Sequence, residues 1–264
     1  ARVTGEEIHF GYLFGFMVIK GDEFEPGDLR RRWKYRIVFQ GNNVKDQDWQ
    51  IALFQEMSAA PATLAAGRVA EVYSCMPGHS IGGRDVEQAY ISAKLGGPPT
   101  YVQLPKDLGT PEMHKMRYPV VRLEKALYGH KNSGVYWNRF CDTACKTKGF
   151  EPLHPNWPSV YWNRDKRLLL VIYVDDLLLS GPKQHMDWAW KELGDVLKLE
   201  RPPGDDDSTH TFLGCVHTRG EMTIKGKPVQ YVRTDVSHAI RKALAKYEVA
   251  VFNITGKYPK LYRV

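Results

Sequence analysis

The pattern of apolar positions is most distinctive at 168–179, where twelve consecutive residues are apolar or aromatic except for two adjacent carboxylates, Asp175 and Asp176. Runs of about four to eight residues rich in Leu, Val, Ile and Tyr are typical of buried strands. Two such runs that meet at a two-residue break predict a tight hairpin with the two aspartates at its turn. Two like charges there are costly unless a cation binds them. An ordinary solvated Asp-Asp turn is the alternative.

Apolar residues recur with helical spacing in four other segments. They predict helices over 58–73, from about Gly134 to Gly149, over 184–197 and over 237–249. In the last of these, the apolar positions form one stripe and leave three cations outside it: Arg241, Lys242 and Lys246. These cations form a basic outer face on the predicted helix.

Shorter β-branched or aromatic runs predict strands up to about Gly21 and over 101–104, 120–123, 161–163 and 211–217. Asp85 lies between a short strand and a predicted helix. Gly82 and Gly83 precede it, and glycine weakens strands. Two stretches, 22–28 and 202–208, are acidic loops.

A dense basic segment follows the first acidic loop, with Trp33 and Tyr35 between its cations. The cations are Arg30, Arg31, Arg32, Lys34 and Arg36. Strand alternation places Lys34 and Arg36 on one face. Such a face suits phosphate, which arginine can bind through two N–H groups; a solvated charged strand is the alternative.

Composition narrows the class of protein. A chain of 264 residues can form one large domain or two small ones. Its net charge of +7 and pI near 9.1 favour a polyanionic partner. Four cysteines in this length indicate no disulfide framework. Cys141 and Cys145 lie one helical turn apart in an apolar stripe, so buried thiols are expected rather than ligands of a four-coordinate zinc ion.

No segment reaches the roughly eighteen apolar residues of a membrane span. The apolar stretch 10–19 is preceded by Glu6 and Glu7, unlike the basic start of a signal peptide. We therefore expect a reducing compartment, namely the cytoplasm, the nucleus or a particle assembled there, and no secretion.

Five segments in order resemble the reverse transcriptase of copia-type LTR retrotransposons, over about residues 33–250. They are KYRIVFQG (34–41), RDVEQAYI (84–91), VRLEKALYGHKNSGVYW (121–137), YVDD (173–176) and TFLG (211–214). The resemblance implies an RNA-directed DNA polymerase. Asp85, Asp175 and Asp176 would be its catalytic residues and would hold two Mg²⁺ ions, for which Mn²⁺ can substitute.

The resemblance also implies a site for the incoming nucleotide. Lys34 and Arg36 would clamp the triphosphate, Tyr90 would lie under the sugar and exclude a 2′-hydroxyl, and Asn132 would contact the nucleotide. A helix residue packed in the core is the alternative for Tyr90. The residues expected to contact template–primer are Tyr173, Phe212, Leu213, Gly214, Arg241, Lys242 and Lys246.

The fold implied by the resemblance is α+β: a right-hand polymerase palm, an antiparallel sheet backed by helices, with fingers and a truncated thumb. Residues 1–75 and 96–132 would form fingers, 76–95 and 133–218 the palm, and 219–264 the primer grip and the start of the thumb. The expected partners are an RNA or DNA template–primer and deoxynucleoside triphosphates, together with other polyprotein-derived domains or a larger assembly.

The second motif departs from the family, which usually has Gln-Ala-Pro where this chain has Asn132-Ser133-Gly134. This departure and the short thumb keep a second hypothesis open, a remnant palm domain that binds nucleic acid or acts as a scaffold without catalysis. A two-metal nuclease or phosphodiesterase is a third, but it explains neither Tyr90 nor the face of Lys34 and Arg36.

Overall fold

The computed structural model describes residues 5–21, 27–29, 31–54, 61–105, 108–201, 205 and 208–260. Within these residues the strands form three sheets. Arg30 and most of the two predicted acidic loops lie outside the described residues.

The central sheet has six antiparallel strands in the order β10-β3-β9-β8-β7-β6. Its strands are β3 (His79–Val86), β6 (Glu151–His154), β7 (Trp157–Asn163), β8 (Leu168–Tyr173), β9 (Asp176–Pro182) and β10 (Leu199–Glu200). The predicted strands at 161–163, 168–174 and 177–179 are therefore confirmed, and β7 and β9 are longer than expected.

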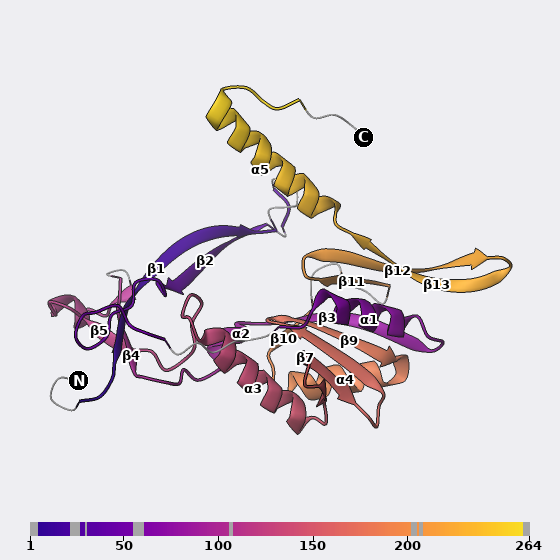
Figure 1. Ribbon diagram of the computed structural model, residues 1–264, viewed down its shortest axis with the longest axis horizontal. Coiled ribbons are helices and arrows are strands. Elements are labelled where there is room, and N and C mark those ends of the chain that lie inside the picture. The colour runs from indigo at the N-terminus through magenta and orange to yellow at the C-terminus, as the bar shows by residue number, and fades with distance from the viewer. Residues whose placement is uncertain are drawn as a thin grey trace.

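Helices cover both faces of this sheet (Figure 1). Leu170 and Ile172 pack with helices α3 (Ser133–Thr147) and α4 (Met186–Gly194), whereas Leu169 and Val171 pack with α1 (Leu64–Ser74) on the other face. Successive strand residues point to opposite faces. Because both faces are buried, the strand sequence is continuously apolar instead of alternating.

A four-stranded sheet has the order β2-β1-β4-β5, with β1 and β4 parallel and the other pairs antiparallel. Its strands are β1 (His9–Lys20), β2 (Arg32–Phe39), β4 (Thr100–Gln103) and β5 (Val120–Arg122). A small core of Phe39, Val44, Ala52 and Val102 lies at its base. Beyond this core, residues 14–17 of β1 and 32–36 of β2 are exposed, and residues 18–20 of β1 are half-buried.

The third sheet contains β11 (Thr209–Phe212), β12 (Cys215–Ile224) and β13 (Lys227–Asp235). The single strand predicted over 211–217 is therefore wrong, because the chain reverses at Leu213 and Gly214. Both residues have positive φ, 53° and 72°, as a type I′ turn requires. The β12–β13 ribbon was not predicted.

Helix α1 begins at Leu64, later than the predicted residue 58. Thr63 caps it by accepting a hydrogen bond from the amide of Ala66 at 3.3 Å. Residues 58–60 lie outside the described residues. The remaining short helices are α2 (Ala89–Ser92) and the 3₁₀ turns η2 (Met113–Lys115) and η3 (Lys183–His185), the last of which replaces the start of the helix predicted at 184–197.

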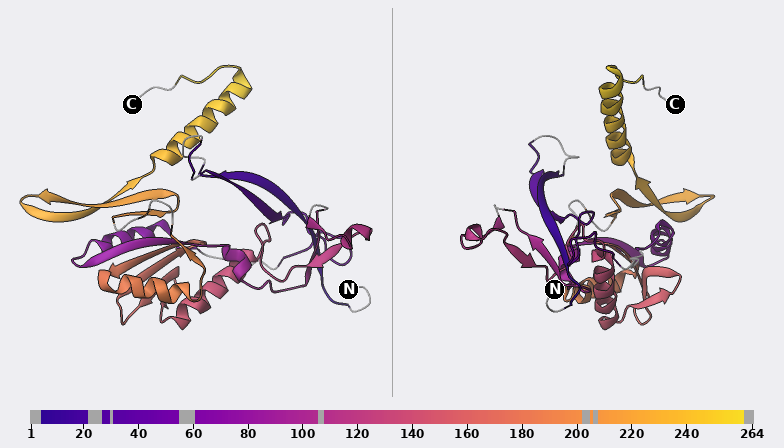
Figure 2. Two further views of the ribbon diagram at one scale, coloured as in Figure 1. Left: turned by 180° about the vertical axis from the view of Figure 1, so that it is seen from behind. Right: turned by 60° about the vertical axis from the view of Figure 1, so that its left-hand side comes forward.

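Helix α5 (Ser237–Thr255) is longer than predicted and ends at Gly256, whose φ is 68°. It stands away from the central sheet in all views (Figures 1 and 2). The predicted apolar stripe is present, but Ile240, Leu244 and Tyr247 are exposed. An apolar stripe in the sequence therefore did not indicate a buried helix here.

The helices and largely antiparallel sheets agree with the predicted α+β class. Cys141 and Cys145 are buried and free, as expected. None of the helices in the described residues is both long and apolar enough to cross a membrane.

Candidate active site at the β8–β9 turn

Val174 and Asp175 form the two-residue turn between β8 and β9, and Asp176 is the first residue of β9. The predicted Asp-Asp turn is thus displaced by one position. Val174 has a φ of 57°, which is unusual for a β-branched residue and costs about 1–3 kcal/mol. Strain of this size is retained where the surrounding structure holds the turn in place.

Two hydrogen bonds hold the turn from either side. The indole N–H of Trp137, on α3, donates to the carbonyl oxygen of Val174 at 2.9 Å. The amide of Val86 donates to the carbonyl oxygen of Asp175 at 2.7 Å. Trp137 was predicted only as part of a helical apolar stripe, since helical spacing indicates the buried face but not which ring reaches a strained turn.

Strand register brings Asp85 to the same place. Asp85 on β3 is the cross-strand partner of Asp176 on β9, although 91 positions separate them. The two glycines before Asp85 do not interrupt β3. A Cβ atom on Gly83 would lie 2.8 Å from the carbonyl oxygen of Thr211, so glycine lets β11 approach the central sheet closely.

The three carboxylates repel one another in a partly buried environment. Burial, and then the charge of Asp175, raise the pKa of Asp85. Burial, followed by Asp175 and Asp85, raises the pKa of Asp176 to about 7. Within the described residues, no ion pair involves any of the three. The charge of Lys20 lowers the pKa of Asp85 only in part. A group of carboxylates that repel one another in this way fits a divalent cation with oxygen ligands.

A hydrogen bond links this site to the third sheet. The amide of Leu213 donates to the Asp176 carboxylate at 3.2 Å. Phe212 is buried against α1, where a Cβ atom on Gly67 would lie 3.1 Å from its ring. Tyr173, the cross-strand partner of Asp176, is partly exposed. Of these predicted nucleic-acid contacts, Phe212 therefore offers only its backbone to a surface ligand.

Two tyrosines lie beside the carboxylates. The rings of Tyr90 and Tyr128 have centroids 4.5 Å apart. Burial, followed by Asp175, raises the pKa of Tyr90 and raises that of Tyr128 to about 12. Tyr128 was not predicted as a site residue. Its position inside the second motif was the available signal.

Asn132 precedes α3 at its N-cap position, but its side chain makes no capping bond there. The backbone amide of Asn132 donates to Nδ1 of His130 at 3.2 Å. The residue of this motif that contacts the ring of Tyr90 is Tyr128. The nucleotide contact of Asn132 stays a prediction.

The basic face of β2 has the predicted alternation. Lys34 and Arg36 lie opposite Val18 and Phe16 of β1. They line a cavity of about 500 Å³ together with Phe16, Val18, Ile19, Lys20 and Lys242. Arg36 is near enough to Tyr128 to counteract part of the rise in its pKa. A path of neighbouring groups therefore runs from this basic face through the tyrosines to Asp175.

The cations predicted on the last helix all lie on α5, which is exposed along its length. Lys242 reaches the cavity beside Lys34 and Arg36. Arg241 and Lys246 are exposed, with no recorded contact to the carboxylates among the described residues. Of the five predicted cations, Lys34, Arg36 and Lys242 therefore line one cavity. Arg241 and Lys246 are not among the residues that line it.

Comparisons with known proteins show the family to which the chain is similar. The family described as reverse transcriptase (RNA-dependent DNA polymerase) matches residues 24–220. The Transposon Ty1-DR1 Gag-Pol polyprotein of Saccharomyces cerevisiae is 25% identical over 178 residues, which are 66% of this chain and 9% of that protein. The Transposon Ty1-BR Gag-Pol polyprotein of the same organism is 24% identical over 170 residues, 62% of this chain and 9% of that protein. This chain thus spans a small part of the curated relatives that it matches.

Proposed function

From the premise that this chain belongs to the reverse transcriptase family of copia-type retrotransposons, we propose that it extends a primer with deoxynucleotides on an RNA template. The observation that carries the proposal is the register of β3 and β9, which sets Asp85 opposite Asp176 beside the turn that holds Asp175. The partners proposed for it are template–primer, deoxynucleoside triphosphates and other parts of a polyprotein.

Asp85, Asp175 and Asp176 would hold two Mg²⁺ ions. When bound, these ions make the primer 3′-hydroxyl nucleophilic and stabilise the pyrophosphate leaving group. The pKa of about 7 means that Asp176 carries a proton part of the time near neutral pH. Asp176 and Asp85 are close enough to share that proton. The carboxylates would release it when cations bind, so extension should weaken as the pH falls below 7.

The nucleotide would lie between the palm carboxylates and the fingers strand. Arg36 and Lys34, which line one cavity, would bind its triphosphate, and their charge would stabilise the charge that develops in the transition state. Tyr90, supported by the ring of Tyr128, would form the floor under the sugar and exclude a 2′-hydroxyl by sterics. Asn132 is proposed as a further nucleotide contact.

The primer would lie along the β11–β12 turn. Leu213 and Gly214 present their backbone there beside Tyr173, and the amide of Leu213 orients Asp176. The cations of α5, Arg241, Lys242 and Lys246, would contact backbone phosphates without sequence preference.

The proposed division assigns 1–75 and 96–132 to fingers, 76–95 and 133–218 to the palm, and 219–264 to the primer grip and thumb. The packing of α1 against β8 and β9 favours counting that helix with the palm. A location in a cytoplasmic particle or in the nucleus is part of the same proposal.

A primer-extension assay tests the function. We expect wild type to extend a DNA primer on an RNA template with Mg²⁺. Asp175→Asn should lower the extension rate by roughly 10³-fold or more, about 4 kcal/mol of transition-state stabilisation, and should leave template–primer binding largely intact. Asp85→Asn and Asp176→Asn should behave alike.

Asp165→Asn is the matched control, since Asp165 is an exposed aspartate in the turn before β8, at the other end of the same strand. It should extend as wild type does. Wild type that binds template–primer and extends nothing would support the scaffold hypothesis, for which the altered second motif is the observation in favour. Equal loss of binding and extension in the three aspartate variants would contradict their assignment.

A further inference from the structure

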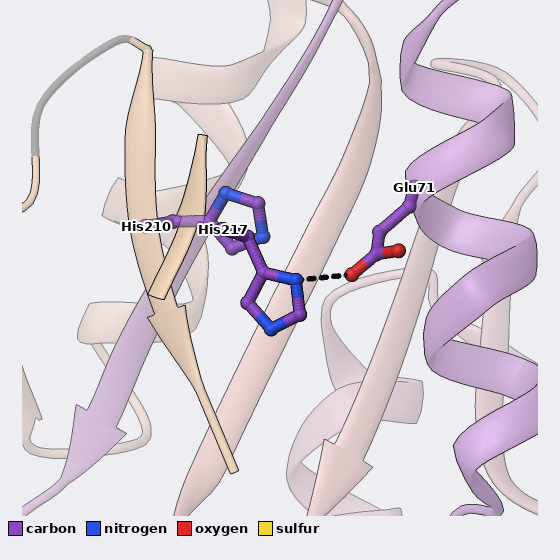
Figure 3. A group of neighbouring side chains, drawn as sticks. All are labelled: Glu71, His210 and His217. Carbon is purple, nitrogen blue, oxygen red and sulfur yellow. Dashed lines mark ion pairs between the residues drawn. The ribbon is translucent and has the colours of Figure 1, made fainter. Parts of the chain in front are cut away.

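A second group of titratable side chains lies on the α1 side of the central sheet. It consists of Glu71 on α1, His210 on β11 and His217 on β12, which converge on one space between the helix and the hairpin (Figure 3). His210 and His217 are cross-strand partners, and their rings stack with centroids 5.0 Å apart and planes 12° apart. One ligand atom of each residue lies within 4.8 Å of the other two.

Both imidazoles are buried deeply. The exposed fraction is 1% for His210 and 7% for His217. Among the described residues, the Nε2 atom of each has no hydrogen-bond partner. A buried polar atom without a partner costs about 1–3 kcal/mol. The ion pair of His217 with Glu71 gives no reason for a second imidazole to be buried against it.

The surroundings leave His210 in the form that binds metals. Burial and then the neighbouring His217 lower the pKa of His210 to about 4, so its ring is neutral at pH 7, and metals bind neutral imidazole. Arg219 lies nearby, but its guanidinium donates to the carbonyl oxygens of Ser74 at 2.7 Å and His79 at 3.2 Å. Its charge is therefore directed to the end of α1.

The distances are close to those of a coordination shell. Glu71 Oε1 lies 2.5 Å from Nδ1 of His217, which is also 3.1 Å from Oγ1 of Thr234. A tetrahedral zinc shell with bonds of about 2.1 Å sets ligand atoms roughly 3.4 Å apart. To reach that spacing, the Glu71–His217 pair would separate by about 0.9 Å, and ligand atoms at the 4.8 Å limit of the group would approach by about 1.4 Å.

The donor types distinguish this group from the three aspartates. Two imidazoles and one carboxylate suit Zn²⁺ and leave a fourth position for water. Carboxylates alone suit Mg²⁺. The two sites should therefore take different ions from a mixture of both.

We propose that Glu71, His210 and His217 bind one Zn²⁺ ion that fastens the β11–β12 hairpin to α1. Zinc binds deprotonated ligand atoms, so a proton held on any of them is released to solvent when the ion binds. The same hairpin carries Leu213, whose amide donates to Asp176. The ion thus fixes a backbone segment that contacts the carboxylate site without being part of that site.

The test is zinc uptake by the whole chain after treatment with a chelator and dialysis. We expect wild type to bind one Zn²⁺ per chain in the presence of excess Mg²⁺, with a rise in melting temperature. His210→Gln and Glu71→Gln should lose the bound zinc and the rise. Co²⁺ in place of zinc should give wild type the visible absorption of tetrahedral cobalt.

Two controls separate this site from other metal binding. His9→Gln removes another buried imidazole that lies beside a carboxylate, Glu7 at 3.4 Å, and it should keep the zinc. Asp175→Asn should also keep it, whether or not the chain extends primers. His210→Cys retains a zinc ligand and should restore uptake if His210→Gln fails to fold. Wild type without zinc, or folded His210→Gln with its full zinc content, overturns the proposal.

Discussion

Two hairpins face the proposed nucleotide site, and they are packed in opposite ways. In the β8–β9 hairpin, residues 168–172 and 177–181 are buried, since α3 and α4 cover one face of the sheet and α1 covers the other. In the β1–β2 hairpin, residues 32–36 are exposed, and its core lies only at its base. The first carries acids at its turn, and the second carries cations along one face.

The difference in packing separates two tasks. A buried hairpin fixes carboxylates closely enough for their mutual repulsion to raise the pKa of Asp176 to about 7, after the effect of burial itself. The exposed β1–β2 ribbon cannot keep like charges close together in this way. Its cations, Lys34 and Arg36, are solvated and line a wide cavity. We therefore expect the acids at the β8–β9 turn to act as a unit and the cations of β2 to contribute separately.

Among changes to the β1–β2 hairpin, Arg36→Ala has the largest expected effect. It removes a fork that can bind two phosphate oxygens, so it should lose roughly 2–4 kcal/mol of transition-state stabilisation, the range for one preorganised donor. Arg36→Lys should recover only part of the loss, because lysine lacks the planar fork. Single-nucleotide extension on an RNA template measures both variants.

Arg32→Ala is the control on the same face of β2. Arg32 is the first residue of β2, and its guanidinium lies 3.9 Å from the carboxylate of Glu200. Its loss should therefore have a smaller effect. If kcat/KM of Arg36→Ala equals that of wild type, Arg36 does not bind the triphosphate directly, and the cations act only through their long-range charge. Folding should change little in either variant, since neither side chain is buried.

Tyr90 lies between the two hairpins and gives a smaller, selective effect. Tyr90→Val opens space under the sugar and should raise ribonucleotide use relative to deoxynucleotide use by roughly tenfold or more. Tyr90→Phe keeps the ring and should keep the discrimination. If Tyr90 is only a core residue, the valine variant will melt at a lower temperature with its discrimination unchanged.

The same contrast explains what could be predicted from sequence. The buried hairpin is recognisable because apolar residues on both faces leave two aspartates as the only exceptions. The alternation of Lys34 and Arg36 is likewise local and is confirmed. The displacement of the turn to Val174 could not be predicted, since β-branched residues disfavour positive φ.

Contacts between distant elements were missed. The ring of Tyr128 reaches Tyr90 because the end of β2 docks against the 128–130 segment, where the amide of Phe39 donates to the carbonyl oxygen of Tyr128 at 2.8 Å. No periodic pattern encodes that docking. The group of Glu71, His210 and His217 likewise forms through the packing of a hairpin on a helix, from positions more than a hundred residues apart. Helix α5 shows the converse. Its apolar stripe would usually indicate a buried helix face, but the residues of the stripe are exposed.

The smallest expected effect is the change in stability of the β8–β9 hairpin with pH. The pKa of Asp176 is about 7 in the folded chain, above its ordinary value of 3.8. Between these two values the folded state binds more protons than the unfolded state, so stability falls as the pH rises through this window. The loss is complete above pH 7. Without divalent cations, wild type should therefore melt at a lower temperature at pH 8 than at pH 5.

Asp176→Asn should remove this part of the pH dependence. The amide oxygen can still accept the hydrogen bond of the Leu213 amide, and the amide nitrogen can donate to Asp85, so packing is conserved. We expect the variant to melt a few degrees above wild type at pH 8, at about 2–4 °C for each kcal/mol, with a smaller difference at pH 5. Mg²⁺ should raise the melting temperature of wild type more than that of the variant at pH 8. Asp165→Asn should follow wild type throughout. A pH dependence in Asp176→Asn equal to that of wild type would show that Asp85, Asp175 and Asp176 do not repel one another as their packing implies.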